Sequence, residues 1–584
     1  MDMSRFGLAL VLGAACAFGA VAEEPLLRFG VYSDTHVTKS IQSFSRVRQA
    51  LALFREKGCE LVVHCGDISE SHDPAAYVSY RQVFDEAFAG GPKPREIYTY
   101  AWHDAFAFKG HAREKAYEDG PAAFEEVRRL LKAENGHTDV VTVKGFAFVV
   151  FPQFVAGKGF LGWEEYEKRV ADACATHPGQ PVFVIDHIPA GGVRGQDSAN
   201  RTGILSKYPQ VVYFCGHAHG TVRSERSINQ KAFTAVNVGC LAGWSGGTVG
   251  NPGPRRPAHE VVTVEVYPDR LLLRRWDVRD RSEVRPERPW LVPWPFDAAT
   301  APWTRERRRA QEPVPTFAAD ASVALRPAGS PFRGFELTYP SAGESACKYR
   351  IDIERKDESG RWASYTWREE LGDWWQAPKD RTATLTSFIG AAYFTPGETV
   401  RLAVVPQNAY GVKGATTIRT DPVTVPSDGV RAETALESAD PAAEFGLCPR
   451  KDKAGKRRRK PDTDGWYGPL GGGEWVIRLP VGLFSGEKGT HYRVTFDLET
   501  DQTESPVRWN LRLSNAAGPG FGSERYKTPA GQSGRMRYVL ELVKKEPGTR
   551  GASDSYDIYF ENASTGRLKP GAVKIERILK WKGR

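Results

Sequence analysis

Strand-like apolar runs alternate with helical patterns between Leu26 and about Asp186, and this alternation constrains the fold more than any other feature. In the first helical segment, Phe44, Val47 and Leu51 recur at steps of three and four residues, which is the spacing of one helix face. Alternating strands and helices pack as α/β layers. The expected strands cover residues 27–32, 61–65, 97–100, 140–143, 146–151, 182–185 and 211–215, followed by a closing hairpin at 261–266 and 271–275.

Short motifs of His and Asp follow several of the expected strands. They are Asp34-Thr35-His36, Gly66-Asp67, His103-Asp104, His187-Ile188-Pro189 and Gly216-His217-Ala218-His219. Because the carboxyl ends of strands in an open α/β sheet meet at one edge, these side chains are expected to converge there. Mixed imidazole and carboxylate ligands suit Mn, Fe, Zn or Co better than Ca or a soft metal. The motifs therefore predict a site for a pair of metal ions.

In the type and order of these motifs, residues 26–280 resemble the calcineurin-like metallophosphoesterase superfamily. One Gly-Asp pair or one His is weak evidence, but an ordered series of motifs after strands is specific. The resemblance implies an α/β metallophosphoesterase sandwich, with two mixed sheets flanked by helices, and two bound divalent metal ions. The implied ligands are Asp34, His36, Asp67 and His219 for the first ion, and Asp67, His187 and His217 for the second.

The resemblance also implies a reaction, the hydrolysis of a phosphate mono- or diester by a hydroxide that bridges the two metals. His103 would protonate the leaving oxygen, and Asp104 would hold the imidazole of His103 and favour its charged form.

One residue departs from the family motif, which is Gly-Asn-His followed by Asp or Glu. This chain has Trp102 before His103, and an indole has no lone pair for a metal. We therefore expect a weaker second metal site, with Trp102 beside His187 and His217. Two other orientations are open: the ring turns away into the core, or it forms a wall against the substrate.

At 584 residues the chain is too long for a single hydrophobic core. In residues 1–22, Arg5 precedes an apolar run from Phe6 to Ala22 that ends in Ala20-Val21-Ala22, which predicts a cleaved signal peptide and a periplasmic or secreted protein without a transmembrane anchor. The alternatives are a membrane anchor and a lipid attached to Cys16. Residues 23–285 form the expected phosphoesterase domain, and the Pro-, Trp- and Arg-rich residues 286–315 form a linker or a strap over that domain. All-β patterns follow: residues 316–426 resemble a fibronectin III or immunoglobulin-like sandwich, and residues 427–584 resemble a jelly-roll, carbohydrate-binding-like domain.

Charge and aromatic content limit the expected partners. The net charge of +9 arises from 80 basic and 71 acidic residues that are mostly interspersed, so no nucleic-acid partner is expected. A phosphate ester is the expected substrate. In the C-terminal part, a polysaccharide or cell-envelope glycan is an expected partner if Trp374, Trp375, Trp466 and Trp475 stack on sugars instead of packing in a core. Two functions remain open: an exported metallophosphoesterase, or a glycan- or surface-binding protein whose phosphoesterase domain is weakly active.

Overall fold

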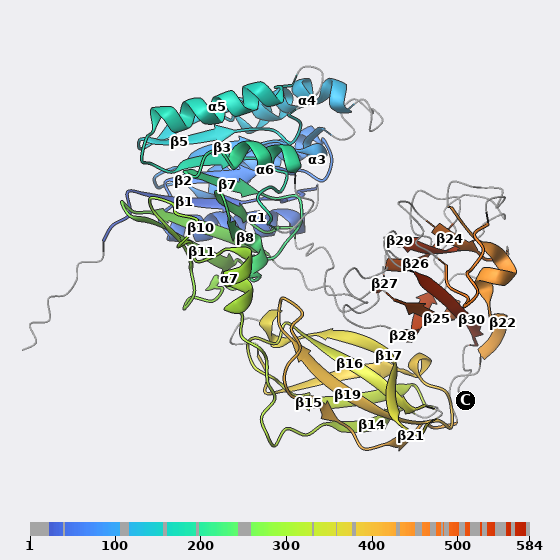
Figure 1. Cartoon of the computed structure of the whole chain (residues 1–584). Coiled ribbons are helices and arrows are strands. Elements are labelled where there is room, and N and C mark those ends of the chain that lie inside the picture. Colours follow the sequence, from blue (N-terminus) through green and yellow to red (C-terminus); the bar gives the residue numbers. More distant parts are fainter. Residues whose placement is uncertain are drawn as a thin grey trace, which may run out of the picture.

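The computed structural model of the chain contains three regions that follow one another in the sequence (Figure 1). A region of sheets and helices comes first, and two regions built mainly of strands follow it. The predicted signal peptide lies outside the described residues. The structure describes residues 23–579 without the segments 39–40, 106–115, 156–159, 194–197, 243–258, 330–331, 358, 376–380, 428–431, 450–457, 468–474, 481–482, 484–489, 502–507, 514–525, 528–533, 544–555 and 562–566.

The first sheet holds the strands that lead into the first three motifs. Its strand order is β12-β11-β10-β1-β2-β3, and β13 also pairs with β11. β1, β2 and β3 are parallel, whereas β10 pairs antiparallel with both β1 and β11. The strands are β1 (Leu27–Tyr32), β2 (Leu61–Cys65), β3 (Arg95–Thr99), β10 (Glu260–Val266), β11 (Arg270–Asp277), β12 (Ser282–Glu283) and β13 (Trp290–Pro293).

The second sheet holds the strands that lead into the last two motifs. Its order is β4-β5-β6-β7-β9-β8. β5, β6, β7 and β9 are parallel, and β4 and β8 pair antiparallel at the two edges. The strands are β4 (Asp139–Val143), β5 (Phe146–Val150), β6 (Val182–Ile185), β7 (Val211–Cys215), β8 (Ile228–Gln230) and β9 (Thr234–Asn237).

The two sheets face each other across a core of aliphatic and aromatic side chains. The ring of Phe29 on β1 meets those of Phe148 and Phe183 on the second sheet edge to face, with centroids 5.4 and 5.1 Å apart. Edge-to-face packing is favourable because the positive ring edge meets the negative ring face. The strands β2, β5, β6 and β7 are buried on both sides along their whole length, which explains their nearly continuous apolar sequences.

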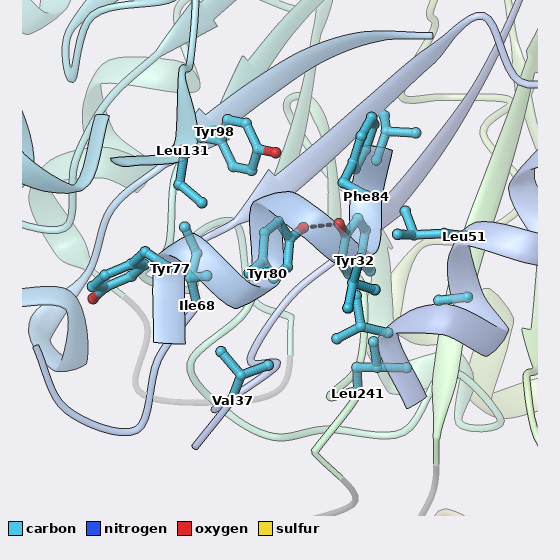
Figure 2. Packing of buried hydrophobic residues seen from close by; sticks show 14 of the residues in the cluster. Tyr32, Val37, Leu51, Ile68, Tyr77, Tyr80, Phe84, Tyr98, Leu131 and Leu241 are labelled. Carbon is cyan, nitrogen blue, oxygen red and sulfur yellow. Dashed lines mark hydrogen bonds between the residues drawn. The ribbon is translucent and has the colours of Figure 1, made fainter. Parts of the chain in front are cut away.

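Helices cover the outer faces of both sheets. α1 (Ile41–Glu56), α2 (Pro74–Ala87) and α4 (Ala116–Leu131) pack on the first sheet, and α5 (Trp163–Thr176) and α6 (Ala199–Leu205) pack on the second. Figure 2 shows part of the core under α1 and α2, where the hydroxyls of Tyr32 and Tyr80 form a hydrogen bond. Two mixed sheets flanked by helices fit the metallophosphoesterase fold expected from the motifs.

The expected strands of the N-terminal region are present, with ends that differ by two residues at most. The strands β8, β9, β12 and β13 and the helices α2, α5 and α6 were not predicted. The start of α2 carries a recognisable signal, since Pro74 opens the helix and the carboxylate of Asp73 accepts a hydrogen bond from the amide of Ala75. β8 has only three residues, too few to show an alternating pattern.

The segment 286–315 belongs to the N-terminal region. β13 extends the first sheet, and the side chains of Trp290 and Trp303 are buried in the core between the two sheets. α7 (Arg305–Ala310) follows, with Arg308 buried. Burying one Trp removes roughly 150–250 Å² of surface from water, worth roughly 4–6 kcal/mol at about 25 cal/mol per Å². The linker interpretation was therefore wrong, and the strap alternative describes the segment.

The residues after the strap form two β-rich regions, each with two antiparallel sheets around a shared core. In the first region the sheets are β14-β15-β18 and β17-β16-β19-β20, with β21 paired to β19. Its strands are β14 (Ala324–Ala328), β15 (Gly334–Pro340), β16 (Lys348–Lys356), β17 (Trp362–Leu371), β18 (Thr384–Gly390), β19 (Thr399–Gln407), β20 (Ile418–Arg419) and β21 (Val423–Thr424).

In the last region the sheets are β22-β30-β25-β28 and β23-β24-β29-β26-β27. Its strands are β22 (Ala432–Ser438), β23 (Leu447–Pro449), β24 (Trp475–Arg478), β25 (His491–Thr500), β26 (Arg508–Leu513), β27 (Tyr526–Lys527), β28 (Gly534–Val543), β29 (Tyr556–Glu561) and β30 (Leu568–Ile578). Trp367 of β17 packs into the core of this region, so the two β-rich regions share an apolar contact.

The tryptophans considered as sugar contacts are engaged in packing. Trp374 and Trp375 are buried in a small cluster with Cys347, and Trp475 packs against the core of the last region. The ring of Trp466 is covered by the guanidinium of Arg567, at 5.1 Å. Sugar stacking on Trp374 and Trp375 is therefore excluded in this structure. Among the described helices, none combines the length and the apolar character needed to cross a membrane.

Candidate metal centre

The predicted ligands lie in loops that directly follow parallel strands. Asp34 and His36 follow β1, Asp67 follows β2, His187 follows β6, and His217 and His219 follow β7. Asp34, His36, Asp67 and His187 are buried, whereas His217 is exposed. The site therefore lies at the carboxyl ends of strands from both sheets and opens to solvent at His217.

Most of these residues have a left-handed backbone, which is rare outside glycine. The φ angles are 52° at Asp34, 41° at His36, 53° at Asp67, 65° at His217 and 44° at His219. Non-glycine residues in this region cost on the order of 1–3 kcal/mol each and cluster at functional sites. Such sharp turns direct consecutive side chains of a loop to one point.

The first group of side chains contains Asp34, His36, Asp67 and His219, whose ligand atoms lie within 4.8 Å of one another. The Nε2 atoms of His36 and His219 are 3.1 Å apart. His219 Nε2 lies 3.2 Å from an oxygen of Asp34, and His36 Nε2 lies 3.8 Å from an oxygen of Asp67. The peptide amide of His217 donates to the Asp34 carboxylate at 3.1 Å and holds it in place.

The second group contains Asp67, His187 and His217. His187 Nδ1 is 2.7 Å from the carbonyl oxygen of Cys65; a carbonyl only accepts, so Nδ1 carries the hydrogen and Nε2 faces Asp67 Oδ2 at 3.1 Å. Nε2 is fully buried and forms no hydrogen bond. A ring nitrogen bonded to a carbonyl, with the other nitrogen directed into a shared site, is the usual arrangement of a metal-ligating His. The donor set therefore fits a metal ion, and Asp67 belongs to both groups.

The electrostatics of the centre favour cations. Burial lowers the pKa of His187, but Asp67 beside it raises that pKa overall to about 9. Burial likewise lowers the pKa of His219, and its hydrogen bond with Asp34 raises it to about 11. Burial alone would raise the pKa of Asp67, yet the facing histidines hold it well below its ordinary value. The buried carboxylates thus retain protons on His187 and His219, and a divalent cation would displace those protons.

His217 differs from these two histidines. Although the residue has an exposed side, the desolvation of its imidazole among the site residues, and then the charge of His187, lower the pKa of His217 to about 4. A neutral imidazole has a free lone pair, so His217 is available as a ligand near neutral pH.

Gly216 allows the loop after β7 to lie close to the loop after β1. A Cβ at this position would lie 1.9 Å from Ser33 Oγ and 2.3 Å from Asp34 Oδ2. Only glycine lets the chain after β7 pass this near to the loop after β1.

Glu70 is a residue of the site that the sequence analysis missed. Its carboxylate lies 3.0 Å from His36 Nδ1, and its carbonyl oxygen lies 2.6 Å from His103 Nδ1. His36, Glu70 and His103 also form a further group whose ligand atoms lie within 4.8 Å of one another. Glu70 follows Asp67 by three residues in the same loop, and that spacing was the only available sequence signal. Through these contacts, Glu70 orients the imidazoles of His36 and His103.

His103 lies at the rim of the first group. Its ring is 4.7 Å from the ring of His36, and its amide donates to Asp67 Oδ1 at 3.1 Å. His103 is partly buried, so its side chain has access to both the centre and the solvent.

The carboxylate of Asp104 forms contacts other than the predicted one. Its carboxylate accepts hydrogen bonds from the amides of Ile68 and Ser69, from the amide of Ala101, and from the hydroxyl of Tyr77. The expected contact with the imidazole of His103 is absent among these bonds. Burial raises the pKa of Asp104 to about 6. Asp104 therefore ties the loop after β2 to α3 (Trp102–Ala105) and acts on the centre through the backbone.

The ring of Trp102 is directed toward the core under α4. It meets Phe154 edge to face, with centroids 5.9 Å apart, and packs against the same core. Its amide donates to Gln153 Oε1 at 2.6 Å. Of the orientations considered for Trp102, the one turned into the core is observed.

Residues 27–221 match the family model of the calcineurin-like phosphoesterases. No curated protein matches the chain significantly. A dimetal phosphatase from Danio rerio is a similar solved structure: it is 11% identical, the match covers 43% of this chain and 96% of that one, and the TM-score is 0.31. A purple acid phosphatase from seeds of yellow lupin (Lupinus luteus) is also similar. It is 14% identical, the match covers 44% of this chain and 52% of that one, and the TM-score is 0.30. TM-scores this low carry no argument about function.

The assignment depends on the family model and on the placement of the His and Asp residues. The matched segment contains every strand that leads into a motif, and it contains both groups of candidate ligands. Residues 27–221, with both groups of candidate ligands, therefore match a calcineurin-like phosphoesterase domain.

Proposed function

We propose that this protein hydrolyses a phosphate mono- or diester with two divalent metal ions, drawn from Mn, Fe, Zn and Co. The observation that carries the proposal is a pair of adjoining His and Asp groups that share the carboxylate of Asp67. Imidazole and carboxylate ligands suit these metals. When bound, a metal pair supplies Lewis-acid stabilisation of the phosphoryl oxygens and activates water for attack.

The residues of this chain would hold the ions, orient the ligands and supply a proton. Asp34, His36, Asp67 and His219 would hold one ion, and Asp67, His187 and His217 the other. Glu70 and the carbonyl of Cys65 orient the imidazoles of His36 and His187. His103, at the rim, would donate a proton to the leaving oxygen of the ester.

Metal removal tests this function directly. The purified full-length chain should hydrolyse p-nitrophenyl phosphate or its bis ester, should lose this activity after exhaustive chelation, and should regain it with Mn, Fe, Zn or Co. The dependence follows because water alone is a poor nucleophile at neutral pH without a metal to activate it. Undiminished hydrolysis by protein shown to be metal-free by elemental analysis would refute the proposal.

We also propose that the protein acts outside the cytoplasm after loss of residues 1–22. The support is the apolar segment that ends in Ala20-Val21-Ala22. Mass spectrometry of the exported chain should give an N-terminus at Glu23. A chain that keeps Met1 or a lipid on Cys16 would contradict cleavage at this site.

Trp102 should weaken the second metal site because it replaces the amide ligand of the family motif. Metal titration into chelated protein should give one tight and one weaker equivalent. Trp102→Asn should strengthen the weaker one by about tenfold, which corresponds to ~1.4 kcal/mol. The matched control is Trp102→Phe, which keeps a ring against Phe154 without adding an amide and should leave the second affinity unchanged. Two equally tight equivalents in the unaltered protein would contradict the weak site.

A second candidate function is binding to glycans or cell surfaces, with a phosphoesterase domain of low activity. Trp102 in place of the ligating Asn is the observation that favours it. The assay above separates the two candidates, because protein loaded with two metals that hydrolyses no ester would support the binding function.

A further inference from the structure

A cleft lined by charged side chains lies between the two β-rich regions. It is bounded by the hairpin of β16 and β17 and by strands β25 and β28, and β17 lies beside β28 (Figure 1). Its volume is about 660 Å³. The basic side chains in its lining are Arg355, Lys356, Arg361, Arg535 and Arg537, and the acidic ones are Asp357 and Asp497. The cleft therefore carries an excess of positive charge.

Both acidic side chains of the cleft are already engaged. Asp497 accepts from Nε and Nη2 of Arg537, at 2.9 and 3.1 Å. Asp357 accepts from the amide and the hydroxyl of Ser359 within its own turn. Within the part of the chain that the structure describes, Arg355, Lys356 and Arg535 form no ion pair with a carboxylate, and all three are exposed. Neighbouring like charges repel one another, and a bound anion would relieve that repulsion.

Tyr365, which lines the cleft, is held in place by its neighbours. The buried hydroxyl of Tyr365 donates to the carbonyl of Tyr393 at 2.8 Å. The guanidinium of Arg355 lies over the Tyr365 ring, 4.8 Å from its centroid, a favourable cation–π arrangement. A smaller hollow of about 320 Å³ shares Tyr365 and Arg537 with the cleft and adds Arg493 and Lys574. The two openings adjoin, so the surface has room for an elongated ligand. In the smaller hollow, Arg493 pairs with Glu576 and Lys574 pairs with Glu437, so the unpaired positive charge lies in the cleft itself.

We propose that this cleft binds a linear polysaccharide that carries carboxylate or sulfate groups. Guanidinium groups match the geometry of such anions through paired N–H donors. The hydroxyls of Ser359 and Ser364, which donate to Asp357 and Asp352, also line the cleft, and their oxygens can accept hydrogen bonds from sugar hydroxyls. The site is separate from the metal centre, so the inference does not depend on the proposed phosphoesterase activity.

The lining favours an acidic polysaccharide over a nucleic acid. Sites for single-stranded nucleic acid combine a basic groove with open aromatic faces on which bases stack. Tyr365, the aromatic side chain of this cleft, is 8% exposed, and its ring is covered by Arg355. A continuous phosphate backbone would also meet the carboxylate of Asp357.

Binding of the full-length protein to immobilised polysaccharides tests the proposal. The probes are polygalacturonate for carboxylates, dextran sulfate for sulfates, neutral dextran, and single-stranded poly(dT). We expect binding to at least one acidic polysaccharide and none to dextran, with affinity falling as NaCl rises, because salt screens exposed charges. Comparing the affinities for polygalacturonate and dextran sulfate shows whether the cleft prefers carboxylate or sulfate groups. Equal binding to neutral dextran, or tighter binding to poly(dT) than to both acidic polysaccharides, would overturn the proposal.

Charge-removing variants locate the site. The triple substitution Arg355→Gln, Lys356→Gln and Arg535→Gln should weaken binding at least ~tenfold through the loss of charge-assisted contacts, with ester hydrolysis unchanged. A control with the same loss of charge is Arg326→Gln, Arg333→Gln and Lys413→Gln, at exposed positions outside the cleft. If both triple variants weaken binding equally, the effect is one of net charge and the cleft is not the site. Arg535→Glu alone should also reduce binding, and unchanged binding by this variant would contradict the proposal.

Discussion

Asp67→Asn should reduce the kcat of phosphate-ester hydrolysis by ~10³-fold or more and lower the metal content from two ions to one or none. Asp67 belongs to both candidate groups, and its oxygen Oδ2 lies 3.1 Å from His187 and 3.8 Å from His36. An amide of the same shape keeps the packing but removes the negative charge that would be shared by two cations. Loss of a group that only hydrogen-bonds a metal ligand already lowers metal affinity or activity ~10–100-fold. Loss of a ligand that would be shared by both ions should therefore lower them further. Steady-state kinetics and elemental analysis of one preparation measure both effects.

A matched control for this variant is Asp73→Asn, the same chemical change at the beginning of α2. Asp73 caps the helix by accepting from the amide of Ala75, and Asn caps helices as well as Asp does. Activity and metal content should therefore stay unchanged. Retention of two metals and most of the activity in Asp67→Asn would show that Asp67 does not bridge the ions.

His103→Gln should lower kcat by ~10²–10⁴-fold, the usual contribution of a general acid, and the loss should depend on the leaving group. An alkyl phosphate leaves as a strongly basic alkoxide and needs the proton, whereas p-nitrophenolate leaves without one. The variant should therefore lose far more activity on the alkyl ester than on the p-nitrophenyl ester. Kinetics with the two substrates measure this ratio.

Metal analysis separates this role of His103 from a ligand role. Because His103 also lies within 4.8 Å of ligand atoms of His36 and Glu70, a loss of bound metal in His103→Gln would identify it as a ligand. Unchanged metal content with a selective loss on the alkyl ester supports the proton donor. The matched control is His177→Gln at the end of α5, where the ring lies 3.0 Å from the carbonyl of Ala173, and neither substrate should be affected.

Much of the N-terminal fold could be predicted from the sequence because several of its strands are buried on both faces. A strand such as β2, with every residue buried, must be apolar throughout, and the residues that follow it stand out as polar. The candidate ligands could be found for the same reason, since Asp67 and His187 come directly after such strands. The elements that escaped prediction were short strands such as β8 and the helices α2 and α5 between the strands.

The sequence could not separate neighbouring residues of one motif that point in different directions. His103 and Asp104 are adjacent, yet the first lies at the metal centre and the second binds backbone amides below it. The direction of each side chain depends on the tight turn after β3 and on the loop after β2 that packs against it. Glu70 belongs to the site through the same loop conformation.

By itself, the sequence determined the α/β layers, the order of the motifs and the chemistry of their side chains, because periodicity and residue type are local properties. Tertiary structure alone decided which surfaces are buried and which charges are left unpaired. Trp290 and Trp303 close the core between the sheets instead of lying in a linker, and Trp374 and Trp375 are buried instead of free for sugars. Burial and pairing depend on segments far apart in the chain, and only the fold brings those segments together.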